Sequence, residues 1–163
     1  MTATNRAALW FEPGRPFEIA EFPIPEPAAG GMTARITRSN ICGSDLHYYR
    51  GDGKRNRAAD PSRGVIQGHE GTGYVHALGD GVVTDWSGAP LAEGDRIAFQ
   101  YFCPCGRCRN CTRGMSEACR QSFSVRQGPL DEWPYVRGTF ADYLYLHPGQ
   151  AVYRVPDTVS DTA

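Results

Sequence analysis

A cluster of cysteines constrains the fold of this chain most, because five of its six cysteines lie in FCPCGRCRNCTRGMSEAC, residues 102–119. Three of these cysteines follow one another with two residues between neighbours, and a fourth comes after seven further residues. Such spacing lets turns direct several thiolates at one point, and a structural zinc site takes four ligands in a tetrahedron. Cys103 stands apart, because only Pro104 separates it from the next cysteine, which is a poor geometry for sharing one ion. The predicted zinc ligands are Cys105, Cys108, Cys111 and Cys119.

The cysteines of this lobe, at about residues 102–120, suit other kinds of site besides a zinc site. Four thiolates also hold iron–sulfur clusters, and in a secreted protein the same residues form disulfides. We favour zinc, and a complete four-thiolate shell leaves no open position for a substrate, so the site is expected to be structural. Its net charge of -2 is offset by nearby arginines, unless these simply form a solvated face. The arginines are Arg107, Arg109, Arg113 and Arg120.

Short strand-like runs, separated by turns, make up most of the remaining sequence. The chain has 19 glycines and 12 prolines, and its runs rich in β-branched and aromatic residues are bounded by such turn formers. These runs are residues 6–11, 33–39, 71–78, 95–102, 139–146 and 151–156. Helical periodicity is weak, with one short helix expected at residues 42–49 and another in the cysteine lobe. The pattern predicts a mainly β, barrel-like domain with one cysteine-rich excursion.

Charge and hydropathy exclude several classes of function. The formal net charge is -1, which gives no signal for binding nucleic acid or an anionic membrane, and nucleic-acid zinc modules are usually small and basic. The N-terminus has no basic region followed by an apolar core, so it is not a secretory signal. No apolar run approaches the ~20 residues that span a bilayer. We therefore expect a cytosolic protein, a setting in which clustered cysteines bind metal or perform redox chemistry.

A second set of metal-type residues lies elsewhere in the sequence. Cys42 stands in NICGSDLHYY and His69 in QGHEGTGYVHALGDGV. Taken singly, the cysteine suits a small buried position and the histidine a structural one. Together they supply one soft and one borderline metal ligand among glycines, which allow close approach of the backbone to a bound group. Asp45 supplies an acid able to accept the other N–H of a ligating imidazole. These residues predict a second zinc site.

These motifs resemble those of the zinc-dependent medium-chain alcohol dehydrogenases. GHEGTGYVHALGDGV fits the zinc signature of that family, with Gly73 three residues after Glu70 and a small residue, Gly79, six later. CGSDLH is similar to the family's first zinc-ligand segment, and the four spaced cysteines to its structural-zinc lobe. EGDRI, GTFADYL and VYRVPD resemble further elements of the family in the same order. The resemblance covers residues 6–158.

The resemblance implies a GroES-like, partly open β-barrel that precedes a Rossmann cofactor domain. Cys42 and His69 are then similar to catalytic zinc ligands, and Glu70 to the acid that sits beside the metal or coordinates it transiently. Asp45 resembles the partner of the ligating histidine. The reaction expected is oxidation of an alcohol or polyol, or reduction of the carbonyl, by hydride transfer with NAD or NADP.

Two further residues take part in this expected chemistry. Ser44 is similar to the hydroxyl that touches the substrate oxygen, and His47 to the outer end of a proton relay. Ser44 could instead be a helix cap, and His47 a surface histidine. We read His76 and His147 as structural, because neither matches a ligand position.

Positions outside these motifs also carry expectations. Tyr101 and Phe102 precede the cysteine lobe, where the family's strand end approaches the substrate, so one of them lines the pocket or both are core aromatics. Residues 84–95 are longer than the shortest family turns, which predicts an inserted hairpin, and Cys103 is an extra thiol.

The sequence contains no G-x-G-x-x-G between a strand and a helix. We therefore expect residues 1–163 to be one GroES-like domain, with the Rossmann domain and a further catalytic-zinc ligand outside it. The isolated chain is predicted to be inactive, and the full-length enzyme to be a homo-oligomer acting on a small alcohol or carbonyl compound. The alternatives are a stand-alone zinc-stabilised binding module and a zinc-free quinone or enoyl reductase.

Overall fold

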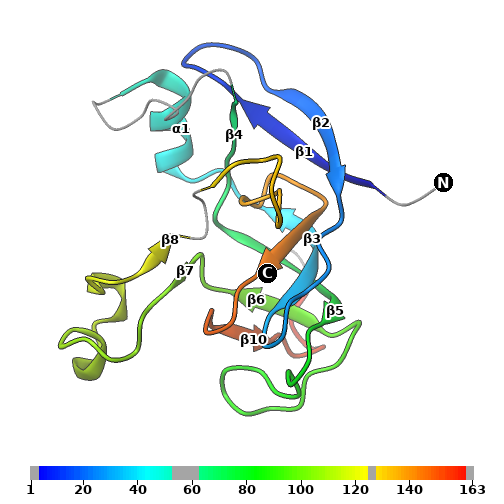
Figure 1. Ribbon diagram of the computed structural model, residues 1–163, viewed down its shortest axis with the longest axis vertical. Helices are drawn as coiled ribbons and strands as arrows, with labels where there is room; N and C mark the ends of the chain where they lie inside the picture. The colour runs from blue at the N-terminus through cyan, green and yellow to red at the C-terminus, as the bar shows by residue number, and fades with distance from the viewer. Residues whose placement is uncertain (1–3, 53–62, 125–127, 161–163) are drawn as a thin grey trace.

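The computed structural model describes residues 4–52, 63–124 and 128–160. Within these ranges the chain is mainly β, as predicted (Figure 1). The strands are β1 (Thr4–Trp10), β2 (Glu18–Pro23), β3 (Met32–Ser39), β4 (Val65–Ile66), β5 (Gly71–Leu78), β6 (Arg96–Phe99), β7 (Phe102–Cys103), β8 (Phe123–Ser124), β9 (Tyr143–Leu146) and β10 (Val152–Arg154). The helices are α1 (Gly43–Arg50) and two short 3₁₀ turns, η1 (Cys111–Arg113) and η2 (Ser116–Ala118).

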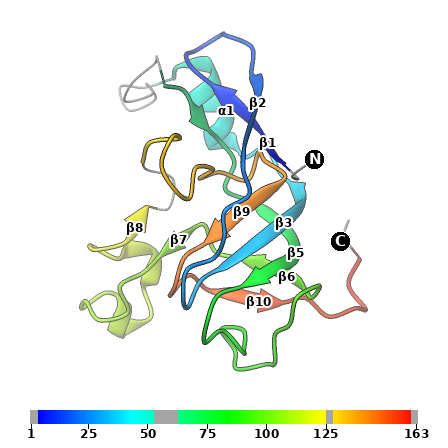
Figure 2. The same ribbon diagram turned by 45° about the vertical axis from the view of Figure 1, so that its right-hand side comes forward.

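Three antiparallel sheets organise these strands. The largest has the order β10-β6-β5-β3-β9, a second has the order β2-β1-β4, and β7 pairs with β8 in the cysteine lobe. The lobe projects to one side of the two larger sheets in both views (Figures 1 and 2). None of the described helices is long and apolar enough to cross a membrane.

Two apolar clusters form the core. One lies on the five-stranded sheet and includes Met32, Val75, Ile97 and Leu146. The other lies at β1 and β4 and includes Leu9, Ile66 and Val136. Members of this cluster alternate along β9, where Leu144 and Leu146 belong to it, but Tyr145 between them is also buried, so both faces of the sheet are covered there.

The expected strands are present, but β2 and the two-residue strands β4 and β8 were not predicted, and two of the predicted runs form shorter strands than expected. β2 was not predicted, because its sequence EIAEFP lacks a strong β-branched run, and it forms through pairing with β1 in the register Arg6↔Glu21. The run at residues 95–102 divides into β6 and β7, which belong to different sheets. In the run at 139–146 only Tyr143–Leu146 forms a strand of a sheet.

The segment at residues 84–95 folds back on itself, as the predicted inserted hairpin would, but it forms no regular strand ladder. An isolated antiparallel bridge joins Thr84 to Pro90, with backbone hydrogen bonds from Asp85 N–H to Ala89 O and from Leu91 N–H to Val83 O on either side of it. The buried Asp85 carboxylate organises the turn, accepting hydrogen bonds from the backbone and hydroxyl of Ser87 and from Ala89 N–H. Arg154 N–H donates to its other oxygen. A buried carboxylate that satisfies several N–H groups holds a turn without needing strand pairing.

Two glycines of the recognised signature are explained by close packing of strands. A Cβ on Gly73 would collide with the carbonyl oxygen of Arg35 on the neighbouring β3, and a Cβ on Gly79 with the carbonyl oxygen of Ala28. The β3–β5 pairing therefore requires glycine at position 73, and the loop that precedes β3 requires it at position 79, just after β5.

Helix α1 begins and ends at recognisable caps. Cys42 is the N-cap, and the Asp45 carboxylate accepts a hydrogen bond from the Cys42 N–H at 3.0 Å. The helix ends at Gly51, which adopts the left-handed conformation with φ 74°. The expected helix at residues 42–49 is thus confirmed.

Candidate metal centres

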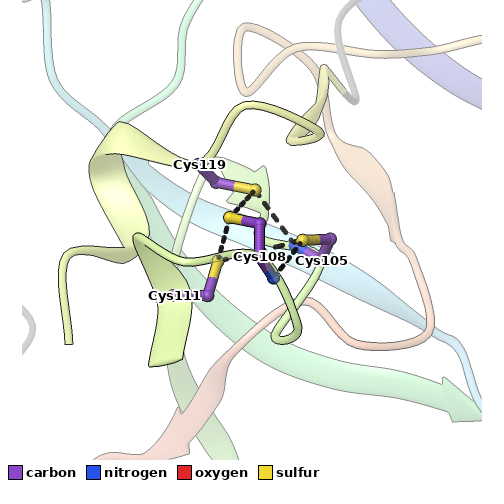
Figure 3. Close-up of side chains that lie close together, drawn as sticks. All are labelled: Cys105, Cys108, Cys111 and Cys119. Atoms are coloured by element: carbon purple, nitrogen blue, oxygen red, sulfur yellow. Dashed lines mark hydrogen bonds between the residues drawn. The ribbon is translucent and has the colours of Figure 1, made fainter. Parts of the chain in front are cut away.

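Four cysteine sulfurs converge in the lobe (Figure 3). The sulfurs of Cys105, Cys108, Cys111 and Cys119 all lie within 4.8 Å of one another. The loop after β7, the η1 turn and the end of η2 bring them together. Cys103 is buried on β7 and is not part of this group, as the sequence predicts.

The spacing of these sulfurs fits a single tetrahedral ion. Thiolates about 2.3 Å from zinc at tetrahedral angles stand about 3.8 Å apart. The observed separations are 3.5 Å for Cys108–Cys111, 3.9 Å for Cys108–Cys119 and 4.0 Å for Cys105–Cys111. A disulfide needs about 2.05 Å, and all six cysteines are free thiols. A multi-iron cluster would spread the four thiolates over two or four irons and so hold at least some pairs of sulfurs further apart.

Backbone N–H groups surround the sulfurs and favour their ionised forms. Cys105 N–H donates to Cys119 Sγ, and Cys108 N–H donates to Cys105 Sγ, both at 3.3 Å. Hydrogen bonds, of which that from Cys111 N–H is the largest contribution, lower the pKa of Cys108 to about 6. Burial, reinforced by the neighbouring thiols, raises the pKa of Cys111 to about 12. Thiols this close resist ionising together, which is the condition that a bound cation relieves.

The arginines of the lobe are not buried against the sulfurs. All four, Arg107, Arg109, Arg113 and Arg120, are exposed. The alternative of a solvated basic face therefore suits them.

A second group of ligand-type atoms lies where β3 and β5 meet. Ser39 at the end of β3 pairs with Gly71 at the start of β5. Cys42 follows the first strand and His69 precedes the second, so the register brings them to one end of the strand pair. One ligand atom from each of Cys42, His69 and Glu70 lies within 4.8 Å of the others.

Ser44 and Asp45 flank this group from the first turn of α1. Ser44 Oγ lies 3.6 Å from Cys42 Sγ and 3.4 Å from His69 Nε2. Ser44 occupies the second helical position rather than the N-cap, so the capping alternative does not apply. Asp45 is buried, and its Oδ1 lies 3.5 Å from His69 Nδ1.

His47 lies on the exposed side of α1, in accord with either role considered for it. Its Nδ1 is 3.2 Å from Asp52 Oδ2. Sequence analysis missed Asp52, because it belongs to no motif, and the only available signal was an acid shortly after the helix.

Aromatic rings and two other histidines complete the surroundings. Tyr101 stands edge-on to His69 at 5.2 Å between ring centroids and is half exposed, while Phe102 packs against Tyr101. His76 packs on Tyr143 and His147 on Tyr145. Burial lowers the pKa of His147, followed by the charge of Arg137. Neither histidine joins a described group of metal ligands.

Comparison with known proteins identifies the fold. The Alcohol dehydrogenase GroES-like domain family matches residues 28–157. An alcohol dehydrogenase of Thermotoga maritima superposes with a TM-score of 0.82 at 26% identity, over 97% of this chain and 42% of that one. A short chain alcohol dehydrogenase of Escherichia coli, solved with NADH, gives 0.71 at 27% identity, over 98% and 41%.

Curated relatives agree in type and differ in substrate. The chain is 36% identical to 5-exo-hydroxycamphor dehydrogenase of Pseudomonas putida over 93% of its own length. It is also 36% identical to L-threonine 3-dehydrogenase of Francisella philomiragia, over 95%. The chain spans 39% of the length of each of these relatives. It belongs to the zinc-dependent medium-chain alcohol dehydrogenase family, and it carries the GroES-like domain of that family.

Proposed function

We propose that this chain is the catalytic domain of a zinc-dependent dehydrogenase that interconverts an alcohol or polyol and its carbonyl compound with NAD or NADP. The observation that carries the proposal is the meeting of Cys42, His69 and Glu70 ligand atoms within 4.8 Å, beside the Ser44 hydroxyl. The four-cysteine site of the lobe would stabilise the fold, and the group of Cys42, His69 and Glu70 would carry out the chemistry.

The donor set of the second group fits a catalytic zinc. One thiolate, one imidazole and one exposed carboxylate are ligands that zinc accepts, and they leave room for a substrate and a further protein ligand. The buried Asp45 carboxylate lies beside the imidazole nitrogen that faces away from Ser44, where a carboxylate orients a metal-bound histidine. Zinc bound there supplies a Lewis acid that lowers the pKa of a coordinated alcohol.

The chain's own side chains then have separate tasks. Ser44 Oγ lies near both Cys42 Sγ and His69 Nε2, so it can relay a proton from a substrate hydroxyl held at that point, releasing its own hydroxyl proton as it accepts the substrate's. His47 lies three residues further along α1, on the same helix face as Ser44, and can pass a proton to solvent. The Asp52 carboxylate orients the His47 ring through a contact with His47 Nδ1.

The four-cysteine site would hold a structural zinc through Cys105, Cys108, Cys111 and Cys119. Its closed shell leaves no position for a substrate.

The residues of the two metal groups do not account for binding of the nicotinamide cofactor. We propose that residues 1–163 act with a Rossmann domain, that the substrate is a small alcohol or carbonyl compound, and that the whole enzyme is a homo-oligomer. Thiols spaced for metal rather than for disulfides suit the reducing cytosol. The substrates of the two curated relatives differ, so neither is carried over to this chain.

Turnover by a full-length enzyme containing this chain tests the proposal. Cys42→Ala and His69→Ala should each abolish alcohol-dependent reduction of NAD⁺ or NADP⁺ and remove one zinc per chain. Cys103→Ala, a buried thiol outside both groups, is the matched control and should keep both zincs and activity. Full activity in either metal-site variant would refute the assignment.

A further inference from the structure

Three buried side chains carry polar atoms without a hydrogen-bond partner among the described residues. They are Trp10 Nε1, both the nitrogen and the oxygen of the Gln67 carboxamide, and Asp45 Oδ1. The exposed fractions of these residues are 0%, 1% and 3%. An unsatisfied polar atom at such depth is costly, so each one requires an explanation.

The three residues come from elements that pack against one another. Trp10 of β1 pairs with Val65 of β4, and Gln67 follows β4 directly. The Trp10 ring meets the ring of Tyr48 on α1, edge-on, with centroids 6.5 Å apart. Asp45 precedes Tyr48 by three residues and so lies on the same face of α1. Both ribbon views place α1 beside β4, the strand that pairs with β1 (Figures 1 and 2).

The chemistry of these atoms decides what kind of molecule could bond to them. Trp10 Nε1 and Gln67 Nε2 are donors, whereas Gln67 Oε1 and Asp45 Oδ1 are acceptors. Two N–H groups disfavour a cation, and the carboxylate disfavours an anion. A small neutral molecule that both donates and accepts satisfies all four, and an internal water typically makes two to four such bonds. We propose that ordered water is bound beneath α1, joining Trp10, Gln67 and Asp45.

This buried water would make Gln67 and Trp10 positioning residues. It holds the Asp45 carboxylate, whose Oδ2 is already fixed by Cys42 N–H, with Oδ1 directed at His69 Nδ1. This consequence rests on the proposed role of His69 as a ligand, whereas the water itself does not.

Nuclear magnetic resonance on the 163-residue chain tests the water directly. The Trp10 indole proton should show a nuclear Overhauser effect to water with the sign of a long-lived bound molecule. Trp133 is the internal control, because its indole N–H donates to Glu26 O at 3.0 Å and should show none of that sign. Absence of the effect at Trp10 would overturn the proposal.

Substitution of Gln67 gives a second test, because the sign of the change in folding stability shows whether water is bound to its carboxamide. If the Gln67 carboxamide lacked any partner, Gln67→Met would stabilise the fold, since it removes a buried unsatisfied group. With bound water, the substitution should lower the folding equilibrium constant about tenfold, measured by urea unfolding. A variant as stable as the wild type, or more so, would contradict the water. Trp10→Phe, which removes only the indole N–H and part of the ring, should lose the same water.

The positioning role has its own readout and control. In the full-length enzyme containing this chain, which is used for the wild type and both variants, Gln67→Met should weaken cobalt(II) binding at the Cys42–His69 site, followed by its visible spectrum. Gln150→Met removes another buried glutamine, which bonds His147 N–H and Gln100 O, and should cost stability without changing cobalt affinity. Equal cobalt affinity in all three proteins would overturn the positioning role. If the wild type bound no cobalt at this site, the proposed function would fail, and the resonance result would still decide the water.

Discussion

At the scale of single residues, the buried Asp85 is a polar side chain whose removal should cost the fold a large part of its stability. Its buried carboxylate accepts four hydrogen bonds, and Asp85→Ala would leave three backbone N–H groups without it. We expect a loss of about 3 kcal/mol in the free energy of unfolding, measured with urea at pH 7. The exposed Asp80, replaced in the same way, should change it by less than about 0.5 kcal/mol.

The same carboxylate predicts a pH dependence of stability. Burial alone would raise the pKa of Asp85, but the N–H of Arg154 and the Ser87 and Ala89 groups outweigh it and lower the pKa. A carboxyl whose folded pKa is depressed stabilises the fold above its unfolded pKa of about 3.9, and that contribution is lost as pH falls through the folded value. Below pH ~4 the wild type should therefore lose stability more steeply than Asp85→Ala. Parallel acid limbs for the two proteins would show that this carboxylate is not ionised in the fold.

At the scale of elements, the cysteine lobe depends strongly on its sulfur cluster. Neither η1 nor η2 contains a buried residue, and among the described residues the lobe is otherwise held by the short β7–β8 pair and by local hydrogen bonds such as that from Asn110 Nδ2 to Ala118 O. Removal of zinc by a chelator, or Cys108→Ser, should therefore unfold the lobe locally. Hydrogen exchange should accelerate at residues 105–121 and stay slow in β3 and β5. Unchanged protection of the lobe without metal would contradict a zinc-held structure.

The β3–β5 pair is the element that sets the second metal group, and Gly73 tests it. Gly73→Ala would drive a Cβ into the carbonyl oxygen of Arg35, a backbone atom that cannot move aside, so we expect a loss of at least about 2 kcal/mol. Gly43→Ala is the matched control, because its Cβ would meet nothing within 4 Å, and alanine favours the first turn of α1. Thermal unfolding of both variants measures the difference, and similar melting temperatures would count against the close approach.

At the scale of the whole molecule, the two candidate zinc sites should differ sharply in affinity. The lobe offers four thiolates from one short segment, whereas the second group offers one thiolate, one imidazole and one exposed carboxylate. We expect the 163-residue chain to hold one zinc through dialysis against a weak chelator and to lose a second. It should not oxidise alcohols with NAD⁺ or NADP⁺, since its sequence carries no dinucleotide fingerprint. Two tightly held zincs, or turnover by this chain alone, would refute the expectation.

Sequence spacing alone was enough to predict the features made by neighbouring residues. Three cysteines two residues apart predict a shared ion because turns of that length direct their sulfurs inward. The cap of α1 is equally local, because Asp45 reaches back only three residues to Cys42 N–H. The exclusion of Cys103 followed from one intervening proline.

Contacts between distant segments were decided by tertiary structure. Only the β3–β5 register places Cys42 beside His69, and without the family resemblance their sequence positions did not imply it. β2 exists through its pairing with β1, and the 84–95 turn through a carboxylate that reaches Arg154. The burial of Gln67 and Trp10 beneath α1 also had no sequence signal. The geometry of a turn or a helix cap is set by the backbone dihedral angles of a few neighbouring residues, so the local sequence predicts it. Strand register and helix packing depend instead on which faces the whole chain can bury together.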